Sequence, residues 1–424
     1  MFKTQEQRFG VGVAVGTMMG TLLEWYEAFL FAVGARYIGS AFFPSKDPVA
    51  SLLSTFIAFA LGFAVRPVGA LFWGWVGDKY GRRHVMLWTL TIGGLATLLI
   101  GVVPDYSSIG IAAPAAVVLL RILQGFSLGG EWGAAVNYIF ENVKRYKRLM
   151  LAIVQSTVAL GLLTAASVFL LLEWILGPSA VATWGWRVAY WLAIVAVLVG
   201  LFFRLRFGET LEYIEAKMSE KRVRSPIGEV FVRYWYETII GIILAGTAGA
   251  VFYYGNTFAP NIAAVTLKTV TPAQQFLAVI IFAVVEILGV ILSGVMAEKI
   301  GTKTTIVTAS VLGLLSASMI QSLLGGFGGL LTIALVAGLA HGLIYTAEAA
   351  FIAEMYPTLA RTTGLSVSYQ FGNAIFAATA PFIMTWILQQ AGGKPEAGLF
   401  NASIYIIVLC LATAIAVGTF RRRT

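Results

Sequence analysis

Apolar runs of about twenty residues recur along the whole chain, and they limit the folds open to it more than any other feature. About twelve runs are present, six on each side of a polar stretch at residues 204–226. They are Val11–Ile38, Leu52–Trp75, Val85–Val103, Ile111–Phe140, Leu149–Leu172, Trp184–Phe203, Thr238–Ala259, Phe276–Met296, Thr305–Leu324, Leu330–Ala353, Thr362–Leu388 and Ala402–Phe420. Each run can cross about 30 Å of hydrocarbon as a helix. Since lipid admits only closed barrels or helices, and the alternating segments of a barrel are missing, the runs predict an all-α membrane protein with twelve transmembrane helices.

The composition agrees with a chain that faces lipid. Hydrophobic residues make up 59% of the sequence and charged residues 12%, whereas a soluble domain carries about 25% charged residues. Cys410 is the only cysteine, so an intrachain disulfide is excluded. The amino-terminal run has no small-residue cleavage site, so we expect it to be retained as the first helix and not removed as a signal peptide.

The distribution of basic residues predicts the orientation in the membrane. The net charge is +9, and the basic residues fall almost entirely in alternate loops and at both termini. Those loops hold Lys79, Arg82, Arg83, Lys144, Arg145, Lys147, Arg148, Lys299, Lys303 and Arg361, together with the block from Arg204 to Arg233. Because cytoplasmic loops carry excess Lys and Arg, we expect a cell (plasma) membrane protein with both termini in the cytoplasm.

Two pairs of loops repeat between the halves of the chain. GWVGDKYGRR (74–83) aligns with GVMAEKIGTK (294–303), and FENVKRYKR (140–148) aligns with AEMYPTLAR (353–361). In the second pair Glu141 matches Glu354 and Arg148 matches Arg361. Such repetition indicates two related bundles. The predicted domains are an amino-terminal six-helix bundle at 1–203, a cytoplasmic linker at 204–236 with a short helix near Glu209–Lys221, and a carboxy-terminal six-helix bundle at 237–424.

The first of these loops resembles the signature GxxxDKxGRR of the major facilitator superfamily. LLEWYEAFLF (22–31), AVRPVGALFWGWVGD (64–78) and RILQGFSLGGEWGAA (121–135) are similar to elements of its metabolite:proton symporter branch, which is related to the sugar porters. The branch usually has aspartate where this chain has Glu27. The resemblance implies two pseudo-symmetric bundles, alternating access and a monomer. It also implies a cytoplasmic gate, to which we assign Gly74, Asp78, Gly81, Arg82, Arg83, Glu141, Arg148, Glu298, Glu354 and Arg361.

Ionisable residues within the apolar runs are candidate functional residues, because a charge near the bilayer centre costs several kcal/mol unless it is paired or hydrated. Glu27 and Arg121 form the leading pair, with Glu24 one helical turn from Glu27. An arginine stays charged, so removing it from beside a carboxylate would favour protonation of that carboxylate. We expect these residues to couple transport to protons, as the resemblance also implies; a permanent structural ion pair is the alternative.

The remaining polar residues of the runs are candidates for substrate binding. His341, Tyr345 and Glu348 share one helical face at spacings of four and three residues. Arg66 precedes Pro67 at an expected kink and could attract an anion or pair with Glu24, whereas Glu131 could bind substrate or serve helix packing among nearby glycines. The full set is Arg66, Gln124, Glu131, Tyr253, Tyr254, Asn256, His341, Tyr345, Glu348, Tyr369 and Asn373.

The resemblance implies a proton-coupled symporter of a small metabolite such as an organic acid, amino acid or betaine, and Arg66 and Arg121 favour a carboxylate-bearing solute. A sugar or polyol symporter is the alternative, and a uniporter, facilitator or channel-like protein without proton coupling is the alternative of another class. The sequence contains no HExxH or Walker motif and no nucleophile–histidine arrangement, so we expect no enzyme activity, cofactor or metal site. The expected partners are the solute, protons and the lipid bilayer, without nucleic acid.

Overall fold

The computed structural model describes residues 22, 25–80, 82–129, 132, 136, 146–206, 227–391 and 395–421. In these ranges all regular elements are helical, and no strand occurs. The predicted all-α class is therefore confirmed. Seven helical stretches within the described ranges are long and apolar enough to cross a membrane, and Leu87–Ile100 and Ala112–Ser127 are shorter apolar helices.

The amino-terminal half begins with a helical segment at 25–33. It continues through α2 (Ala35–Phe42), α3 (Pro48–Ala64), α4 (Arg66–Tyr80), α5 (Arg82–Ile100), α6 (Tyr106–Ile109), α7 (Ala112–Ser127), α9 (Lys147–Leu176), α10 (Pro178–Ala180), η1 (Val181–Gly185), α11 (Trp186–Trp191) and α12 (Ala193–Arg206). Two of these boundaries have local causes. Asp47 accepts a hydrogen bond from the Val49 amide (2.9 Å) with Pro48 at the first position of α3, and α4 begins directly before Pro67.

The carboxy-terminal half runs from α14 (Ile227–Val232) to α22 (Pro395–Thr419). Between them lie α15 (Trp235–Tyr253), η2 (Tyr254–Phe258), α16 (Ala259–Asn261), η3 (Ile262–Thr266), α17 (Pro272–Ile300), α18 (Thr302–Ser318), η4 (Ile320–Gly325), α19 (Phe327–Met355), α20 (Thr358–Gly372), η5 (Asn373–Ala377) and α21 (Ala380–Gln390). A capping box of Thr271 and Gln274 starts α17. The short helix expected near Glu209–Lys221 lies outside the described residues.

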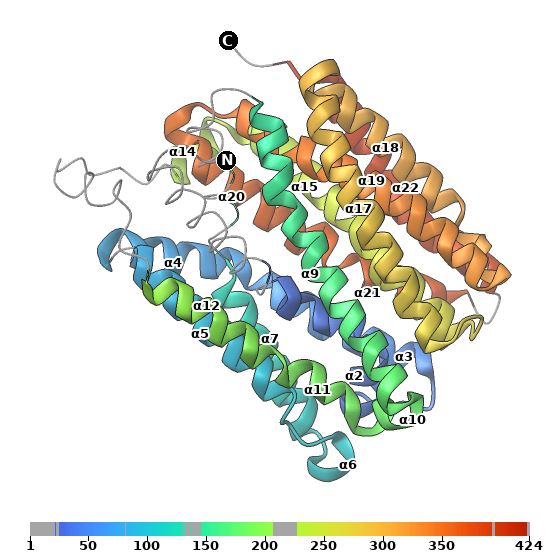
Figure 1. Ribbon diagram of the computed structural model, residues 1–424. Helices are drawn as coiled ribbons and strands as arrows, with labels where there is room; N and C mark the ends of the chain where they lie inside the picture. The colour runs from blue at the N-terminus through green and yellow to red at the C-terminus, as the bar shows by residue number, and fades with distance from the viewer. Residues whose placement is uncertain are drawn as a thin grey trace, which may run out of the picture.

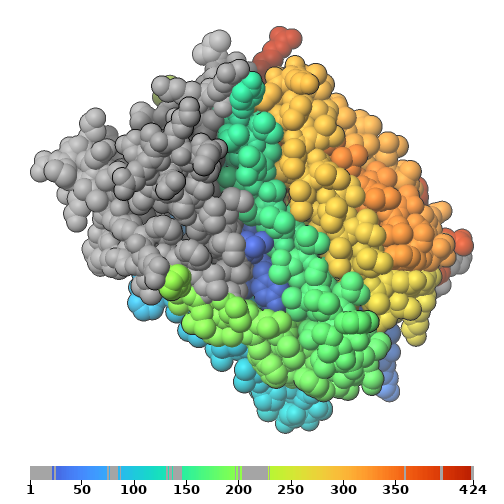
Figure 2. All heavy atoms as spheres, viewed as in Figure 1, coloured from blue at the N-terminus to red at the C-terminus, as the bar shows by residue number. Residues whose placement is uncertain are grey.

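The two halves lie side by side and meet along long helices. In Figure 1 the blue-to-green helices form one group and the yellow-to-red helices the other, with α9 running along α17 between them. Figure 2 shows the same neighbours at the surface, where atoms of α9 follow those of α17 along the seam. This arrangement places the interior side chains of both groups around a common centre.

Glycines allow helices within each half to approach closely. A Cβ built on Gly125 of α7 would lie 1.6 Å from the Gly62 carbonyl oxygen of α3. A Cβ on Gly342 of α19 would lie 2.4 Å from the Glu286 carbonyl oxygen of α17. No side chain fits at either position, so backbone contact between small residues holds these pairs together, as is common in membrane helix bundles.

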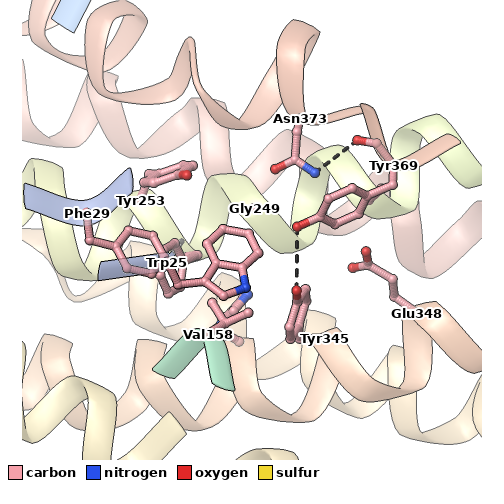
Figure 3. Close-up of a pocket in the computed structure, with 12 residues that line it drawn as sticks. Trp25, Phe29, Val158, Gly249, Tyr253, Tyr345, Glu348, Tyr369 and Asn373 are labelled. Carbon is pink, nitrogen blue, oxygen red and sulfur yellow. Dashed lines mark hydrogen bonds between the residues drawn. The ribbon is translucent and has the colours of Figure 1, made fainter. Parts of the chain in front are cut away.

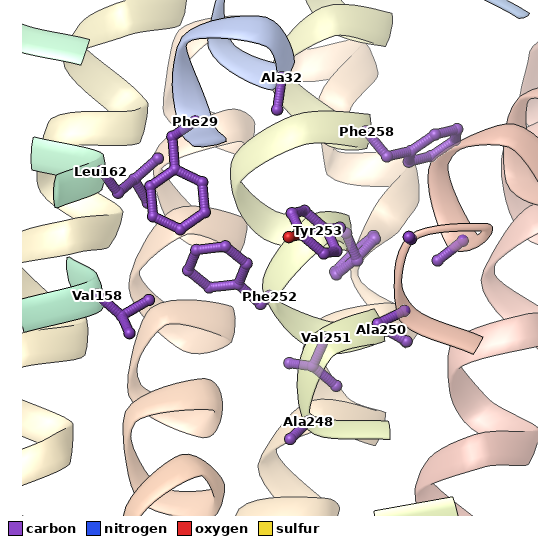
Figure 4. Packing of buried hydrophobic residues seen from close by; sticks show 14 of the residues in the cluster. Phe29, Ala32, Val158, Leu162, Ala248, Ala250, Val251, Phe252, Tyr253 and Phe258 are labelled. Carbon is purple, nitrogen blue, oxygen red and sulfur yellow. The ribbon is translucent and has the colours of Figure 1, made fainter. Parts of the chain in front are cut away.

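Aromatic and aliphatic side chains from both halves pack where the halves meet. Figure 4 shows Phe29, Val158 and Leu162 of the amino-terminal half beside Phe252 of α15. The ring centroids of Phe29 and Phe252 are 5.2 Å apart. Large apolar side chains also cover the outside, where Trp174 is 83% exposed and Ile111 is 76% exposed. An exterior of this kind suits lipid and not water.

Candidate functional site

A cavity lies between the two halves near the middle of the long helices. Trp25, Phe29 and Val158 line it from the amino-terminal half (Figure 3). The carboxy-terminal half contributes residues of α15, α19, α20 and η5, namely Ala245, Gly249, Phe252, Tyr253, His341, Tyr345, Glu348, Tyr369 and Asn373. Because both halves build its wall, a relative movement of the halves would open it, as alternating access requires.

Three predicted residues of α19 reach this cavity together. His341, Tyr345 and Glu348 all line it, as their helical spacing leads one to expect. The rings of His341 and Tyr345 stack at 5.0 Å. The Tyr345 hydroxyl lies 3.5 Å from the Tyr369 hydroxyl of α20. The imidazole and the two tyrosines therefore lie next to one another in the cavity wall.

Glu348 is the acidic group of this wall. Its side chain is fully buried, and neither carboxylate oxygen has a hydrogen-bond partner in the described part of the chain. In Figure 3 its carboxylate points toward Tyr345 and Tyr369. A buried carboxylate in this position is available to a bound molecule.

His341 is held by an acid of the neighbouring helix. Its Nδ1 lies 2.9 Å from Oε1 of Glu286 on α17, and both side chains are buried. The Phe252 ring packs against the imidazole at 4.6 Å between centroids. Glu286 thus satisfies and orients the imidazole at the edge of the cavity, a relation that the sequence alone did not reveal.

A second buried polar network lies in the amino-terminal half and contains both members of the leading pair. Arg121 Nη1 donates to Gln124 Oε1 (2.8 Å), and Gln124 Nε2 donates to the Thr97 hydroxyl. Thr97 Oγ1 lies 3.3 Å from Glu27 Oε2 and 2.9 Å from the Gly93 carbonyl oxygen. Arg121 and Glu27 are therefore joined through an amide and a hydroxyl rather than by a direct ion pair.

The rings around Arg121 keep water away from this network. Its guanidinium lies 4.6 Å from the Phe31 ring centroid and 5.4 Å from that of Phe59. Its Nη2 also approaches the Phe59 carbonyl oxygen at 3.5 Å. Glu27 and Arg121 are 4% and 3% exposed, respectively. Charges in such a setting interact strongly, because the local dielectric constant is low.

The other substrate-binding candidates take different positions. The Arg66 guanidinium lies over the Phe63 ring at 3.7 Å, and Phe63 contacts the cavity-lining Tyr253 at 5.8 Å. Asn373 lines the cavity and donates to the Tyr369 carbonyl oxygen (2.9 Å).

Tyr254, Asn256 and Gln124 are not among the residues that line the cavity. Tyr254 donates to the Ser316 carbonyl oxygen of α18 (2.9 Å), and Asn256 donates to the Phe252 carbonyl oxygen (2.6 Å).

One end of the seam is closed by charged side chains that cross between the halves. Arg148 at the start of α9 binds Glu298 of α17 through its backbone amide (3.0 Å) and Nη1 (3.3 Å), and Glu354 of α19 through Nη2 (2.5 Å). Thr302 also donates to Glu354 (3.2 Å). Arg361 instead donates to the Ala353 carbonyl oxygen (3.0 Å), within its own half. Charge-assisted bonds of this kind would break if the halves separated here.

Eight other predicted residues lie wholly or partly outside the described part of the structure. Gly74 and Asp78 fall in α4, and Arg82 and Arg83 begin α5, but the side chains of Asp78, Arg82 and Arg83 lie outside the described part of the structure. Glu24, Gly81, Glu131 and Glu141 lie outside the described residues altogether.

Sequence reasoning missed two residues of the amino-terminal half that contact the cavity-lining tyrosines of the other half. Trp132 stacks on Tyr369 at 3.8 Å between centroids, and its Nε1 donates to the Tyr345 hydroxyl (3.1 Å) and to Gln155 Oε1 (3.2 Å). Gln155 of α9 in turn donates to the Tyr345 carbonyl oxygen (3.3 Å). Trp132 and Gln155 stand out in the sequence as polar or hydrogen-bonding residues within apolar runs. Nothing in the sequence indicates that they contact the other half.

Two helical groups around a cavity that both line, closed at one end by ion pairs, have the architecture of a solute transporter. The family follows from comparison with known proteins. The sequence model of the Major Facilitator Superfamily matches residues 13–266 and 247–424, and the chain therefore belongs to this superfamily. The protein is a multi-pass membrane transporter and not an enzyme.

Individual relatives agree with this assignment. The chain is 32% identical to the inner membrane metabolite transport protein YhjE of Escherichia coli (strain K12), over 92% of this chain and 91% of that protein. It is 28% identical to a citrate-proton symporter of Klebsiella pneumoniae, over 97% of this chain and 94% of that protein. The crystal structure of a D-xylose-proton symporter superposes with a TM-score of 0.73 at 15% identity, covering 95% of this chain and 97% of that one. The predicted twelve-helix fold is thus confirmed.

Proposed function

We propose that this chain is a proton-coupled symporter of a small carboxylate-bearing solute that works by alternating access. The observation that carries the proposal is the buried connection from Glu27 through Thr97 and Gln124 to Arg121. Its ends are an acid that can take up a proton and a base that stays charged. The similarity to a citrate-proton symporter supports the same conclusion.

The network explains how a proton could be exchanged for a conformational change. While Glu27 is ionised, the arginine offsets its charge through the intervening dipoles of Gln124 and Thr97. When a movement of the helices separates these groups, the carboxylate loses that stabilisation and takes up a proton. Protonation thereby becomes linked to one arrangement of the halves, which is what coupling requires.

Arginines near the cavity support a carboxylate on the solute. The Arg66 guanidinium contacts the Phe63 ring, and the Arg121 guanidinium contacts the Phe59 ring. Both rings pack against Tyr253, and the ring centroids of Phe59 and Tyr253 are 5.0 Å apart. A guanidinium can bind a carboxylate with two parallel hydrogen bonds. A change in the position of Tyr253 would bring either group to the solute.

The ion pairs of Arg148 supply the gate of this proposal. The bonds from Arg148 to Glu298 and Glu354 hold the halves together at one end, and we assign that end to the cytoplasm together with both termini. Opening there would break these bonds and expose the cavity. The proposed functional units are the bundles at 1–203 and 237–424, joined by the linker at 204–236, in a monomer.

The test is uptake by the purified protein in proteoliposomes. With an inward proton gradient, wild type should accumulate at least one radiolabelled carboxylate-bearing solute from a panel of organic acids, amino acids and betaines. A protonophore should abolish the accumulation but leave exchange of internal for external solute intact. Equal accumulation with and without the gradient would contradict proton coupling, and accumulation of sugars alone would contradict the carboxylate.

A further inference from the structure

Glu348 combines full burial, a position in the cavity wall and a carboxylate without a hydrogen-bond partner in the described structure. An isolated charge within a membrane bundle is costly, and acids retained there usually face a pathway or a ligand. The other acid of this region, Glu286, is engaged by His341 at 2.9 Å. Among the described residues, Glu348 is therefore the acid that a bound solute would meet.

The walls around Glu348 are aromatic. Six of the lining residues carry aromatic rings other than imidazole: Trp25, Phe29, Phe252, Tyr253, Tyr345 and Tyr369. In Figure 3 the indole of Trp25 lies between Phe29 and Tyr345. Aromatic rings stabilise alkylated ammonium groups, which they attract through their negative faces and desolvate without requiring hydrogen bonds.

The charges of the lining residues also favour a cationic group on the solute. Among the described residues, the lining includes Glu348 but neither arginine nor lysine. A solute with several carboxylates would bring like charges together next to Glu348, whereas a cationic group would neutralise this acid. The arginines lie outside the wall, behind Tyr253. A positive group at Glu348 and a negative group directed toward Tyr253 would therefore match the surroundings.

We propose that the cavity recognises an ammonium group, with Glu348 as its counter-ion and the rings of Trp25, Phe252 and Tyr345 as its apolar wall, so that the transported solute is a zwitterion. This inference rests on the proposed function, which supplies the carboxylate of the same solute. It excludes di- and tricarboxylic acids as preferred substrates. It also gives Glu348 a role in recognition that is separate from the role of Glu27 in coupling.

Two probes of equal shape test the ammonium group directly. Glycine betaine and tert-butylacetate have the same carboxylate and the same branched end, but only glycine betaine carries a positive nitrogen. Binding to purified protein is measured by isothermal titration calorimetry at one pH, without a membrane gradient. We expect wild type to bind glycine betaine at least about tenfold more tightly than tert-butylacetate, and citrate to bind more weakly than glycine betaine.

Substitutions assign the preference to Glu348. Glu348→Gln should reduce the preference to less than about twofold, whereas Glu348→Asp, which keeps the charge, should retain most of it. Glu237→Gln is the matched control, because Glu237 is a buried acid of α15 (4% exposed) that does not line the cavity. If Glu348→Gln fails to fold, the ratio of the two affinities in wild type and in Glu348→Asp still tests whether the site prefers a positive nitrogen.

Three results would overturn the proposal. One is a wild type that binds tert-butylacetate as tightly as glycine betaine; another is no binding of either glycine betaine or proline at millimolar concentration. The third is a Glu348→Gln variant that keeps the preference but loses gradient-driven accumulation, which would make Glu348 a proton carrier. Gradient-driven uptake of citrate by the same preparation would support proton-coupled symport of a carboxylate but would contradict the preference for a zwitterionic solute.

Discussion

The two halves of the transporter bury similar ionisable groups but satisfy them differently. In the amino-terminal half, Glu27 and Arg121 belong to one hydrogen-bonded network through Gln124 and Thr97. In the carboxy-terminal half, Glu286 pairs with His341, whereas the described residues provide Glu348 with no hydrogen-bond partner. A hydrogen-bonded network can couple a charge to the conformation of its helices, whereas the Glu348 carboxylate is available to a molecule that enters the cavity.

From this difference we infer that the two halves have different roles in transport. The amino-terminal network lies behind the cavity wall, and among its members none lines the cavity. The carboxy-terminal half contributes nine of the twelve described lining residues, including Glu348. We therefore expect substitutions in the amino-terminal network to affect coupling, and substitutions around α19 to affect mainly affinity or stability.

Removal of the arginine should have the largest effect. Arg121→Met takes away the charge that offsets Glu27 and leaves Gln124 Oε1 without its donor. We expect gradient-driven uptake to fall by at least about a hundredfold, because loss of this positive charge makes Glu27 harder to ionise and so hinders release of its proton. Arg121→Lys is the control and should retain more uptake, since it keeps the charge without the planar guanidinium. Equal loss in both variants would show that the charge is not what matters.

Loss of the ion pairs between the halves should have the second-largest effect. Arg148→Ala removes the side-chain bonds to Glu298 and Glu354, and we expect the equilibrium between closed and open states at this end to shift by about tenfold toward open. The side chains involved are about one third exposed, at 28%, 26% and 36%, so solvent reduces the effect. Spin labels at Met150→Cys and Ile300→Cys, in a Cys410→Ala background, would report the separation of α9 and α17.

Arg361→Ala is the matched control for this experiment. Among the described residues, Arg361 donates to a carbonyl oxygen of its own half and makes no bond across the seam, so its loss should leave the distance distribution between the labels unchanged. A longer distance in both variants would show that the Arg148 bonds do not hold the halves together.

Removal of the Thr97 hydroxyl, which connects Gln124 to Glu27, should reduce accumulation less. Thr97→Val keeps the shape and both charges but removes the hydroxyl that accepts from Gln124 and lies beside Glu27. We expect the accumulation ratio to fall by about fivefold while solute exchange continues, because one or two buried hydrogen bonds are lost. Thr97→Ser should behave like wild type. Wild-type accumulation by Thr97→Val would mean that Glu27 does not need this connection.

The carboxy-terminal pair should give the smallest change in transport. His341→Gln leaves an amide near Glu286, so we expect coupling to persist and the KM to rise by about two- to threefold, as one cavity-lining ring is lost. A Glu286→Gln variant tests the pair from the other side and should also remain coupled. Loss of accumulation with retained exchange in either variant would place coupling in both halves and remove the contrast between them.

Much of the fold was predictable because membrane helices need long apolar runs. The run Leu330–Ala353, for example, lies within the observed α19 (Phe327–Met355). The prediction was less complete where the helix carries polar residues. The run Thr238–Ala259 stopped early, whereas the helical stretch continues through Asn261 to Thr266, by way of the π-helical segments η2 and η3. Local widening of a helix depends on its neighbours and leaves no periodic signal in the sequence.

The site was only partly predictable for related reasons. Buried charges are conspicuous in apolar runs, so Glu27, Arg121 and Glu348 could be selected from the sequence. Thr97 could not, because threonine in a membrane helix commonly bonds to its own backbone. The repeat aligned Arg148 with Arg361, but only Arg148 crosses to the other half. Contacts between halves depend on packing, which internal sequence symmetry does not encode.

The most direct test of the account is transport by Glu27→Gln in proteoliposomes, measured both as accumulation driven by a proton gradient and as exchange at equal pH. The substitution keeps the size of the side chain and an oxygen that can accept from Thr97, but it removes the proton-binding group. We predict that accumulation is lost while exchange remains within about threefold of wild type. Gradient-driven accumulation by this variant at the wild-type level would contradict the assignment of proton coupling to Glu27.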